Sequence, residues 1–249
     1  MIEPANDSIP DVLPAPFEWC EIPAGKVTLE GNAGSFEVKP FKIAKYPVTY
    51  AQFQVFIDAQ DGFQDDRWWQ GLAERDKQPG EQCWKIADHP RETVTWYAAV
   101  AFCRWLSNRA SYEVRPPAEW EWQWAAQGSD GRQYPWGDEY IKGYANVKVN
   151  SAKGGVLQSK TSAVGSYPQG ASPFGVLDMA GNVWEWCLNE FNQPGNIGIS
   201  GSASRVVRGG SMADYEKHAR CASRGRMRPS RFYNCLGFRV VLSLSNADF

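Results

Sequence analysis

The chain has 249 residues and a formal net charge of −2, so it lacks the basic excess on which non-specific nucleic-acid binding depends. No apolar run approaches the roughly 20 residues that cross a bilayer, and the N-terminus lacks the basic and apolar regions of a signal peptide. We therefore expect a cytoplasmic protein that binds no nucleic acid and does not insert into membranes. Display at the cell surface by other means is the open alternative.

The cysteines are widely scattered, and none forms a CxxC pair or a cluster with histidine, so a zinc site is not expected. We expect free, mostly buried thiols, with one or two disulfides as the alternative if the protein lies outside the cell. The six are Cys20, Cys83, Cys103, Cys187, Cys221 and Cys235.

The chain begins with a segment rich in Pro, Asp and Asn, which has little to bury. We predict a disordered lead-in over residues 1–16 and a single domain over residues 17–249. Alternating residues predict a strand at 27–29 and a second strand within 36–49.

Two amphipathic helices are predicted, at 49–59 and 93–109. Thr49 is a typical N-cap residue, and Phe53, Phe56 and Ile57 then lie on one helix face. The loop between the helices is long and contains three tryptophans, which favours a packed or functional loop over an idle one.

After Gly128, glycine, proline, asparagine and serine dominate, and short strands are predicted near 205–208 and 237–242. In GNVWEW a strand conformation would send Trp184 and Trp186 one way and Glu185 the other. The glycines of RGGS indicate backbone with positive φ or a close approach between chain segments.

Seven motifs follow one another: RPPAEWEWQWAAQ (115–127), YPWGDEY (134–140), YANV (144–147), FGVLDMAGNVWEWCLNEF (174–191), RVVRGGSM (205–212), RCASR (220–224) and LGFRVV (236–241). In this order they resemble the formylglycine-generating (sulfatase-modifying) enzyme family, over about residues 17–243. The resemblance implies an α+β domain with a C-type-lectin-like fold, built from two helices, short twisted strands and much irregular loop.

The resemblance also implies what catalysis would need. The family's oxidase holds copper(I) with a cysteine pair just after the GGS motif, because soft thiolates bind that ion. Residues 212–219 contain no cysteine, so we expect no copper and no enzyme activity. An oxidoreductase of the sulfatase-modifying type, acting on a cysteine or small thiol, is the alternative.

A related branch of the family uses histidine-bound iron, but this chain has only two histidines. We expect His89, which precedes a proline, to pack or hydrogen-bond at the entry to a helix. We expect His218 to be solvated.

The segment 212–235 mixes aromatic and miscellaneous residues with arginines and fits neither a helical nor a strand period. Exposed aromatic and arginine side chains are typical of recognition surfaces. Five residues look like a constant framework: Arg220, Ala222, Arg224, Arg226 and Pro229. The candidate ligand-binding residues are Met212, Asp214, Tyr215, His218, Ser223, Gly225, Met227, Arg228, Ser230, Phe232, Tyr233 and Asn234.

This segment resembles the variable region of diversity-generating retroelement variable proteins, in which randomised adenines in a DNA template diversify a C-terminal patch. Most of the candidate residues are reachable from asparagine codons, whereas Met212, Glu216, Lys217 and Met227 need other template codons. We therefore predict a monomer that binds a protein or other macromolecule. An ordinary basic loop is one alternative. A carbohydrate-binding lectin is another, although the tripeptides of the usual lectin calcium site are absent.

Calcium is the one metal that the resemblance implies, because oxygen ligands from loops suit it. The matching positions are Asn182, Val183 and Glu185 for one ion and Asn146 and Val147 for a second. A carboxylate of Glu185 paired with an arginine is the alternative.

Overall fold

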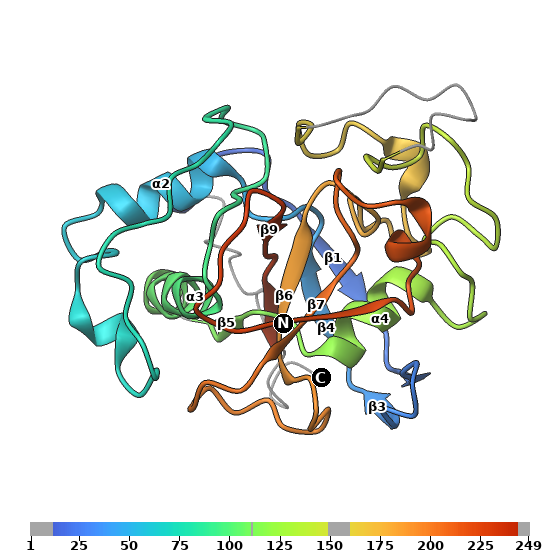
Figure 1. Cartoon of the computed structure of the whole chain (residues 1–249), viewed down its shortest axis with the longest axis horizontal. Helices are drawn as coiled ribbons and strands as arrows, with labels where there is room; N and C mark the ends of the chain where they lie inside the picture. Colours follow the sequence, from blue (N-terminus) through green and yellow to red (C-terminus); the bar gives the residue numbers. More distant parts are fainter. Residues whose placement is uncertain (1–11, 111, 149–159, 244–249) are drawn as a thin grey trace, which may run out of the picture.

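The computed structural model describes residues 12–110, 112–148 and 160–243 (Figure 1). Strands lie in the middle of the molecule, and the helices α2 (Tyr50–Asp58) and α3 (Trp96–Ala110) lie to one side of them. Helix α4 (Glu119–Gln127) lies on the other side. The predicted α+β class is confirmed. None of the helices in these ranges is long and apolar enough to span a bilayer.

The first sheet joins the two ends of the described chain. Its four strands are antiparallel to their neighbours, and the C-terminal strand lies inside the sheet. Their order is β1 (Trp19–Ile22), β4 (Phe41–Ala44), β10 (Val241–Ser243) and β5 (Val114–Arg115).

A hairpin of β2 (Gly25–Thr28) and β3 (Ser35–Val38) lies beside this sheet. The segment 36–49, predicted as one strand, is therefore divided between β3 and β4. Pro40 lies at the break, where a residue without a backbone N–H cannot continue a ladder.

The second sheet carries the C-terminal motifs. Its strands are, in order, β8 (Arg224–Met227), β7 (Arg205–Arg208), β6 (Trp184–Glu190) and β9 (Leu236–Gly237). β8 is an edge strand, and β9 runs parallel to β6. Short 3-10 turns complete the elements at η1 (Asp66–Trp69), η3 (Pro168–Gly170) and η4 (Glu216–Ala219).

Both predicted helices are confirmed, and each begins at a hydroxyl cap. The backbone N–H of Gln52 donates to Oγ1 of Thr49, and the Gln52 side chain accepts from the Thr49 N–H, which closes a capping box. Thr95 accepts from the N–H of Ala98 at 3.0 Å, so α3 begins later than the predicted residue 93.

Helix α4 was not predicted. Its first turn is capped by a side chain inside the helix, because the Glu121 carboxylate accepts from the Ala118 N–H at 2.7 Å. The helix ends at Gly128, which has a φ of 68°.

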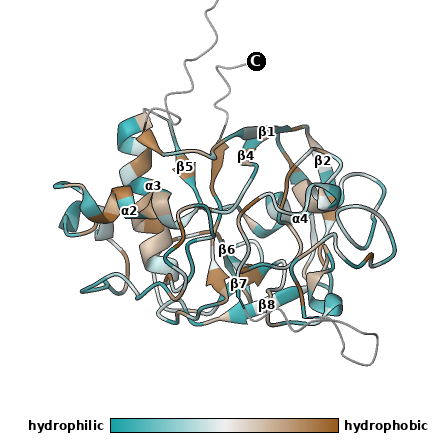
Figure 2. Ribbon diagram, turned by 90° about the horizontal axis from the view of Figure 1, so that it is seen from above, coloured by the Kyte–Doolittle hydropathy of each residue, from teal (hydrophilic) through white to brown (hydrophobic). Residues whose placement is uncertain are grey.

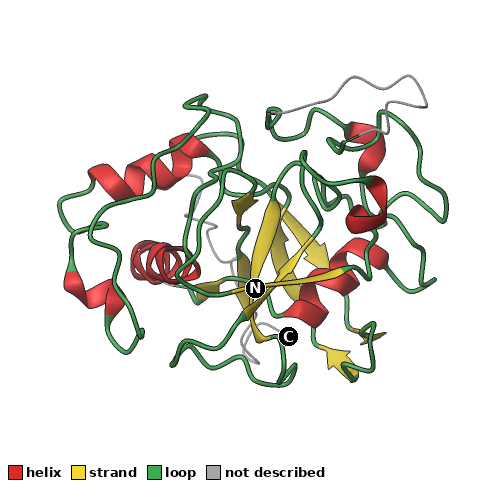
Figure 3. Cartoon of the chain, in the orientation of Figure 1, coloured by secondary structure: helices red, strands yellow, loops and turns green. Residues whose placement is uncertain are grey.

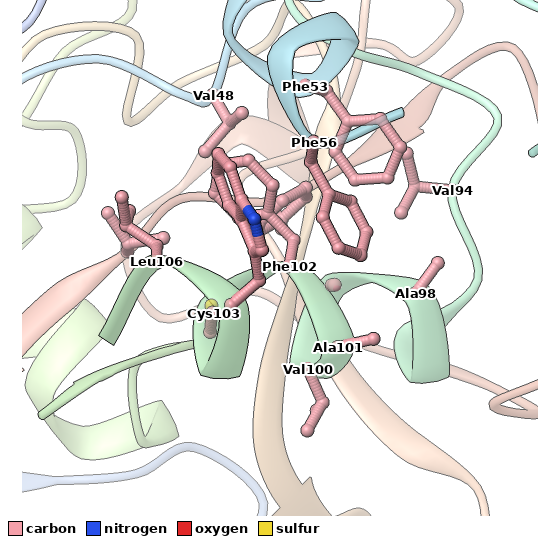
Figure 4. Packing of buried hydrophobic residues seen from close by; sticks show 14 of the residues in the cluster. Val48, Phe53, Phe56, Val94, Ala98, Val100, Ala101, Phe102, Cys103 and Leu106 are labelled. Atoms are coloured by element: carbon pink, nitrogen blue, oxygen red, sulfur yellow. The ribbon is translucent and has the colours of Figure 1, made fainter. Parts of the chain in front are cut away.

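Aromatic rings fill the space between α2, α3 and the second sheet (Figure 4). Phe53 stacks on Phe102, with centroids 5.4 Å apart, and meets Phe238 edge-on at 6.0 Å. A second cluster packs α4 against the first sheet through Trp122 and Ile43. In Figure 2, strand β7 has the colour of hydrophobic residues. Loops surround the strands (Figure 3).

The disordered lead-in is wrong for residues 12–16. Leu13 is 2% exposed and belongs to the core around α2 and α3. The Gln52 amide donates to the carbonyls of Pro14 and Pro16 at 3.0 and 2.7 Å, so this segment is held against α2. Residues 1–11 lie outside the described residues.

Candidate binding surface

The segment 212–235 enters through a backbone turn that only glycine accepts easily. Gly209 and Gly210 follow β7 with φ of 92° and 72°. A Cβ on Gly210 would lie 3.0 Å from the carbonyl carbon and oxygen of His218. The glycines of RGGS therefore combine positive φ with a close chain approach, as predicted.

Inside the molecule, one carboxylate holds two arginines. Glu119 on α4 accepts from Arg208 at 2.7 Å and from Arg224 at 2.6 and 2.8 Å. Arg208 and Glu119 are fully buried. The guanidinium of Arg224 also lies 4.8 Å from the ring centroid of Phe191. These bonds fix β7 and β8 against α4.

The stretch after β8 is tied by its backbone to the start of α3. The carbonyl of Pro229 accepts from the Trp96 N–H at 2.9 Å, and that of Tyr233 accepts from the Thr93 N–H at 3.0 Å. In the same stretch, the Arg231 N–H donates to the Arg228 carbonyl at 2.9 Å and closes a turn. Residues 228–234, which we call the outer loop, thus have an anchored backbone.

Most side chains of the outer loop face solvent, whereas Pro229 is buried and Ser230 is half-buried. Phe232 is 52% exposed and Tyr233 44%, and Tyr215, elsewhere in the segment, is 40% exposed. Arg228 and Asn234 are exposed as well. The half-buried candidate residues are Asp214, His218, Gly225, Met227 and Ser230.

Two candidate residues do not belong to this surface. Met212 is 2% exposed, and its N–H donates to the Asn182 carbonyl, so it packs inward directly after the glycine turn. Ser223 is 8% exposed, and its hydroxyl donates to the Lys217 carbonyl at 3.0 Å. Their inclusion among exposed ligand-binding residues was wrong.

Trp184 contacts the segment 212–235 both near its start, at Asp214 and His218, and at its end, at Cys235. The sequence did not reveal these contacts. Its indole N–H donates to Asp214 at 2.8 Å, and its ring meets the His218 ring at 6.3 Å between centroids. Its backbone N–H donates to the Cys235 carbonyl. A Cβ on Gly225 would lie 3.3 Å from the ring. Half-buried Trp184 thus forms a floor beside Asp214 and His218.

All six cysteines are free thiols. Burial raises the pKa of Cys221 to about 12 and raises the pKa of Cys235 above its ordinary value. A thiol with a raised pKa is a poor nucleophile and metal ligand, because the thiolate is the reactive form. Cys235, which directly follows the outer loop in the sequence, is therefore not activated as a nucleophile.

The histidines differ in their surroundings. His89 is 8% exposed, its Nδ1 lies 2.8 Å from the Thr161 hydroxyl, and burial lowers its pKa. This confirms the predicted hydrogen-bonding role. His218 is half-buried against Trp184 and is therefore less solvated than expected.

The expected first calcium site is occupied by protein groups. Both oxygens of buried Glu185 accept from Arg239 at 2.6 Å, and Oε2 also accepts from the Trp122 indole at 2.7 Å. Oδ1 of Asn182 accepts from the Ser162 N–H at 3.0 Å. The pairing of Glu185 with an arginine is therefore what the structure contains, and Glu185 does not fit a calcium ligand.

The second expected calcium site differs from the first, because one of its side-chain oxygens has no hydrogen-bond partner among the described residues. Asn146 is 1% exposed, and its Oδ1 is buried without a hydrogen-bond partner among the described residues. The adjoining Val147 is also buried. No group of three or more His, Cys, Asp or Glu side chains in the described ranges could hold a metal ion.

The family model of the sulfatase-modifying factor enzyme 1-like domain matches residues 16–244. The chain belongs to this family. It is 31% identical over 238 residues to the serine/threonine-protein kinase Pkn1 of Chlamydia trachomatis, a match over 89% of this chain and 34% of that protein. It is 36% identical over 178 residues to the formylglycine-generating enzyme of Streptomyces coelicolor, over 62% and 52% of the two chains. The chain thus spans about a third to a half of these relatives.

Among solved structures, Treponema denticola variable protein 1 has the same fold. The TM-score is 0.67 at 23% sequence identity, and the match covers 91% of this chain and 95% of that one. This structural similarity shows that the two proteins share the C-type-lectin-like fold of the family.

Proposed function

We propose that this domain is a non-catalytic binding module, and that its ligand is a protein or other macromolecule held against the surface formed by Trp184, Tyr215 and the outer loop of residues 228–234. The observation that carries the proposal is the contrast between an anchored backbone and exposed aromatic side chains. Phe232 and Tyr233 face solvent, although the carbonyls of Pro229 and Tyr233 are bonded to the start of α3. A rigid backbone lowers the entropy cost of binding, and exposed rings supply contact area.

The absence of oxidase activity rests on the sequence after the glycine turn. Residues 212–219 contain no cysteine, and Cys235, beyond them, has a raised pKa. Incubation with copper, a thiol and a Cys-x-Pro-x-Arg peptide should yield no aldehyde by mass spectrometry. A robust yield would support the alternative, a sulfatase-modifying oxidoreductase.

A random peptide library displayed on phage provides a direct test of binding. Peptides selected on the wild type should lose binding to a variant with Tyr215, Phe232 and Tyr233 changed to alanine. The matched control changes the three other exposed large hydrophobics, Ile86, Ile141 and Ile197, to alanine. Selected peptides that respond equally to both variants would refute this binding surface.

Diversification of the surface is tested in the flanking DNA. A reverse-transcriptase gene and a near-copy of codons 205–241, differing only at template adenines, are expected. Their absence would favour a binding domain with a fixed ligand.

A further inference from the structure

The outer loop carries two arginines that lack the carboxylate partners of Arg208, Arg220 and Arg224, while Arg226 on β8 is exposed as well. Arg228 and Arg231 are exposed, and neither has a carboxylate within ion-pairing distance among the described residues. Arg208 and Arg224 are instead paired with Glu119, and Arg220 with Glu30. The outer loop therefore presents guanidinium groups whose hydrogen-bonding capacity faces solvent.

These arginines lie within a local excess of positive charge. The segment 212–235 holds six basic and two acidic residues, although the whole chain has a net charge of −2. One of the two acidic side chains, Asp214, is bonded to Trp184 and Ser211. Long-range attraction at this surface therefore favours an anionic ligand.

The neighbouring side chains select the kind of anion. Arg228 and Arg231 share a seven-residue loop with the exposed rings of Phe232 and Tyr233. Nucleic-acid binding at physiological salt relies on many phosphate contacts, typically about 6–10 in a specific complex. Two guanidiniums on the same short loop as two exposed rings instead match carboxylates that lie next to apolar side chains.

We propose, on the basis of the binding function above, that the outer loop recognises an acidic protein segment, in which Asp or Glu side chains accept from Arg228 and Arg231 while apolar side chains pack on Phe232 and Tyr233. The loop backbone is fixed to Thr93 and Trp96, so the two arginines are held on one short turn. Acidic residues flanking an aromatic or aliphatic residue form the expected motif.

The strand before the loop provides a matched arginine control. Arg226 pairs with Val206, which packs in the cluster around α4, and its guanidinium lies 5.5 Å from the Phe191 ring centroid. Met227 packs instead on the core around α2 and α3. Because neighbouring residues of a strand point to opposite faces, Arg226 lies on the face turned away from the outer loop. An Arg220→Gln/Arg226→Gln double variant removes the same charge as Arg228→Gln/Arg231→Gln.

The phage-displayed random peptide library serves as the probe. Peptides that depend on Tyr215, Phe232 and Tyr233 should be enriched in Asp and Glu over the unselected library. Arg228→Gln/Arg231→Gln should weaken their binding about tenfold, which corresponds to two surface ion pairs of about 0.7 kcal/mol each. Arg220→Gln/Arg226→Gln should weaken it less than about twofold, because those side chains lie off the loop.

The outcomes separate the two proposals. A library that yields no peptide dependent on the three aromatic residues overturns the binding function and this inference with it. Surface-dependent peptides that lack acidic residues, or that respond equally to the two double variants, overturn only the acidic-segment inference. Displacement of the peptides by a single-stranded oligonucleotide that binds more tightly through Arg228 and Arg231 would assign the loop to nucleic acid instead.

Discussion

The arginines buried under α4 and the arginines of the outer loop use the same chemical group for opposite purposes. Arg208 and Arg239 are fully buried and bonded to Glu119 and Glu185, so their charges are satisfied within the protein. Arg228 faces solvent from a loop whose backbone is already anchored. The two groups differ in their surroundings, because Arg208 and Arg239 each bond a carboxylate inside the protein, whereas no carboxylate lies within ion-pairing distance of Arg228 among the described residues.

The largest effect on stability is expected from removing the carboxylate that pairs with a buried arginine. Glu185→Gln should destabilise the domain by about 3–5 kcal/mol, because it leaves Arg239 buried without its charge partner. Urea unfolding at neutral pH measures the change. Glu37→Gln, which breaks an exposed pair with Lys26, should cost less than about 1 kcal/mol. Equal effects would show that burial of the pair is unimportant.

Asp178 is a buried carboxylate without a guanidinium bonded to it, and its ionisation should lower the stability of the protein. Burial raises the pKa of Asp178 to about 6, although the Gly165 N–H donates to it at 2.7 Å. A carboxyl whose folded pKa lies above its unfolded pKa contributes stability at low pH, and loses it as the pH rises through about 6. Unfolding free energy should therefore fall between about pH 4 and pH 6, by up to about 3 kcal/mol.

The matched variant for this pH dependence is Asp178→Asn, which keeps an acceptor for Gly165 and cannot ionise. The difference in unfolding free energy between wild type and variant should change across that interval. A constant difference from pH 4 to pH 7 would mean that Asp178 does not titrate there.

Two glycine variants can separate the cost of a positive φ from the cost of a steric contact. Gly210→Ala should cost about 1–3 kcal/mol, because its φ is 72° and the added Cβ would meet the His218 carbonyl. Gly71→Ala has a φ of 73° with no atom within 4 Å of the new Cβ, so it isolates the cost of the dihedral. If thermal melts show the same loss for both, the close approach at Gly210 contributes nothing.

Substitution of the exposed aromatic residues should have little effect on stability. Alanine at Tyr215, Phe232 and Tyr233 should change the unfolding free energy by less than about 0.5 kcal/mol at each position, because these side chains are exposed. Thermal melts of the single variants measure this. A loss of several kcal/mol at any one of them would place that ring in the core.

Chelation should have the smallest effect of all. Because Glu185 is already bonded to Arg239 and Trp122, EDTA should leave the melting temperature unchanged. A rise of several degrees on adding calcium, lost in Asn146→Ala, would instead place an ion at the buried Oδ1 of Asn146.

Elements with local signals could be predicted from the sequence. Thr49 and Gln52 form a capping box before an apolar face, and the helix lies where these residues place it. Helix α4 lacks both signals, because its N-cap is Ala118 and it is buried on more than one side, which hides the helical period. The motif order identified the fold even though this helix was missed.

The candidate surface was predictable in outline but not residue by residue. A loop has no period from which to read burial, so Met212 and Ser223 could not be told from exposed neighbours such as Phe232. The role of Glu185 depended on Arg239, 54 residues further along the chain, and the contact of Trp184 with Asp214 could not be predicted because Asp214 is 30 residues away. Pairings at such separations leave no local pattern.

The position of β10 sets the order in which the protein can be completed. This strand lies between β4 and β5, and Arg239, just before it, donates to the Ala44 carbonyl 195 residues away. During synthesis, the first sheet therefore cannot close until the chain has left the ribosome as far as β10. Until then, β4 exposes an unpaired edge, which makes a nascent chain of this fold dependent on late, long-range closure and vulnerable to aggregation.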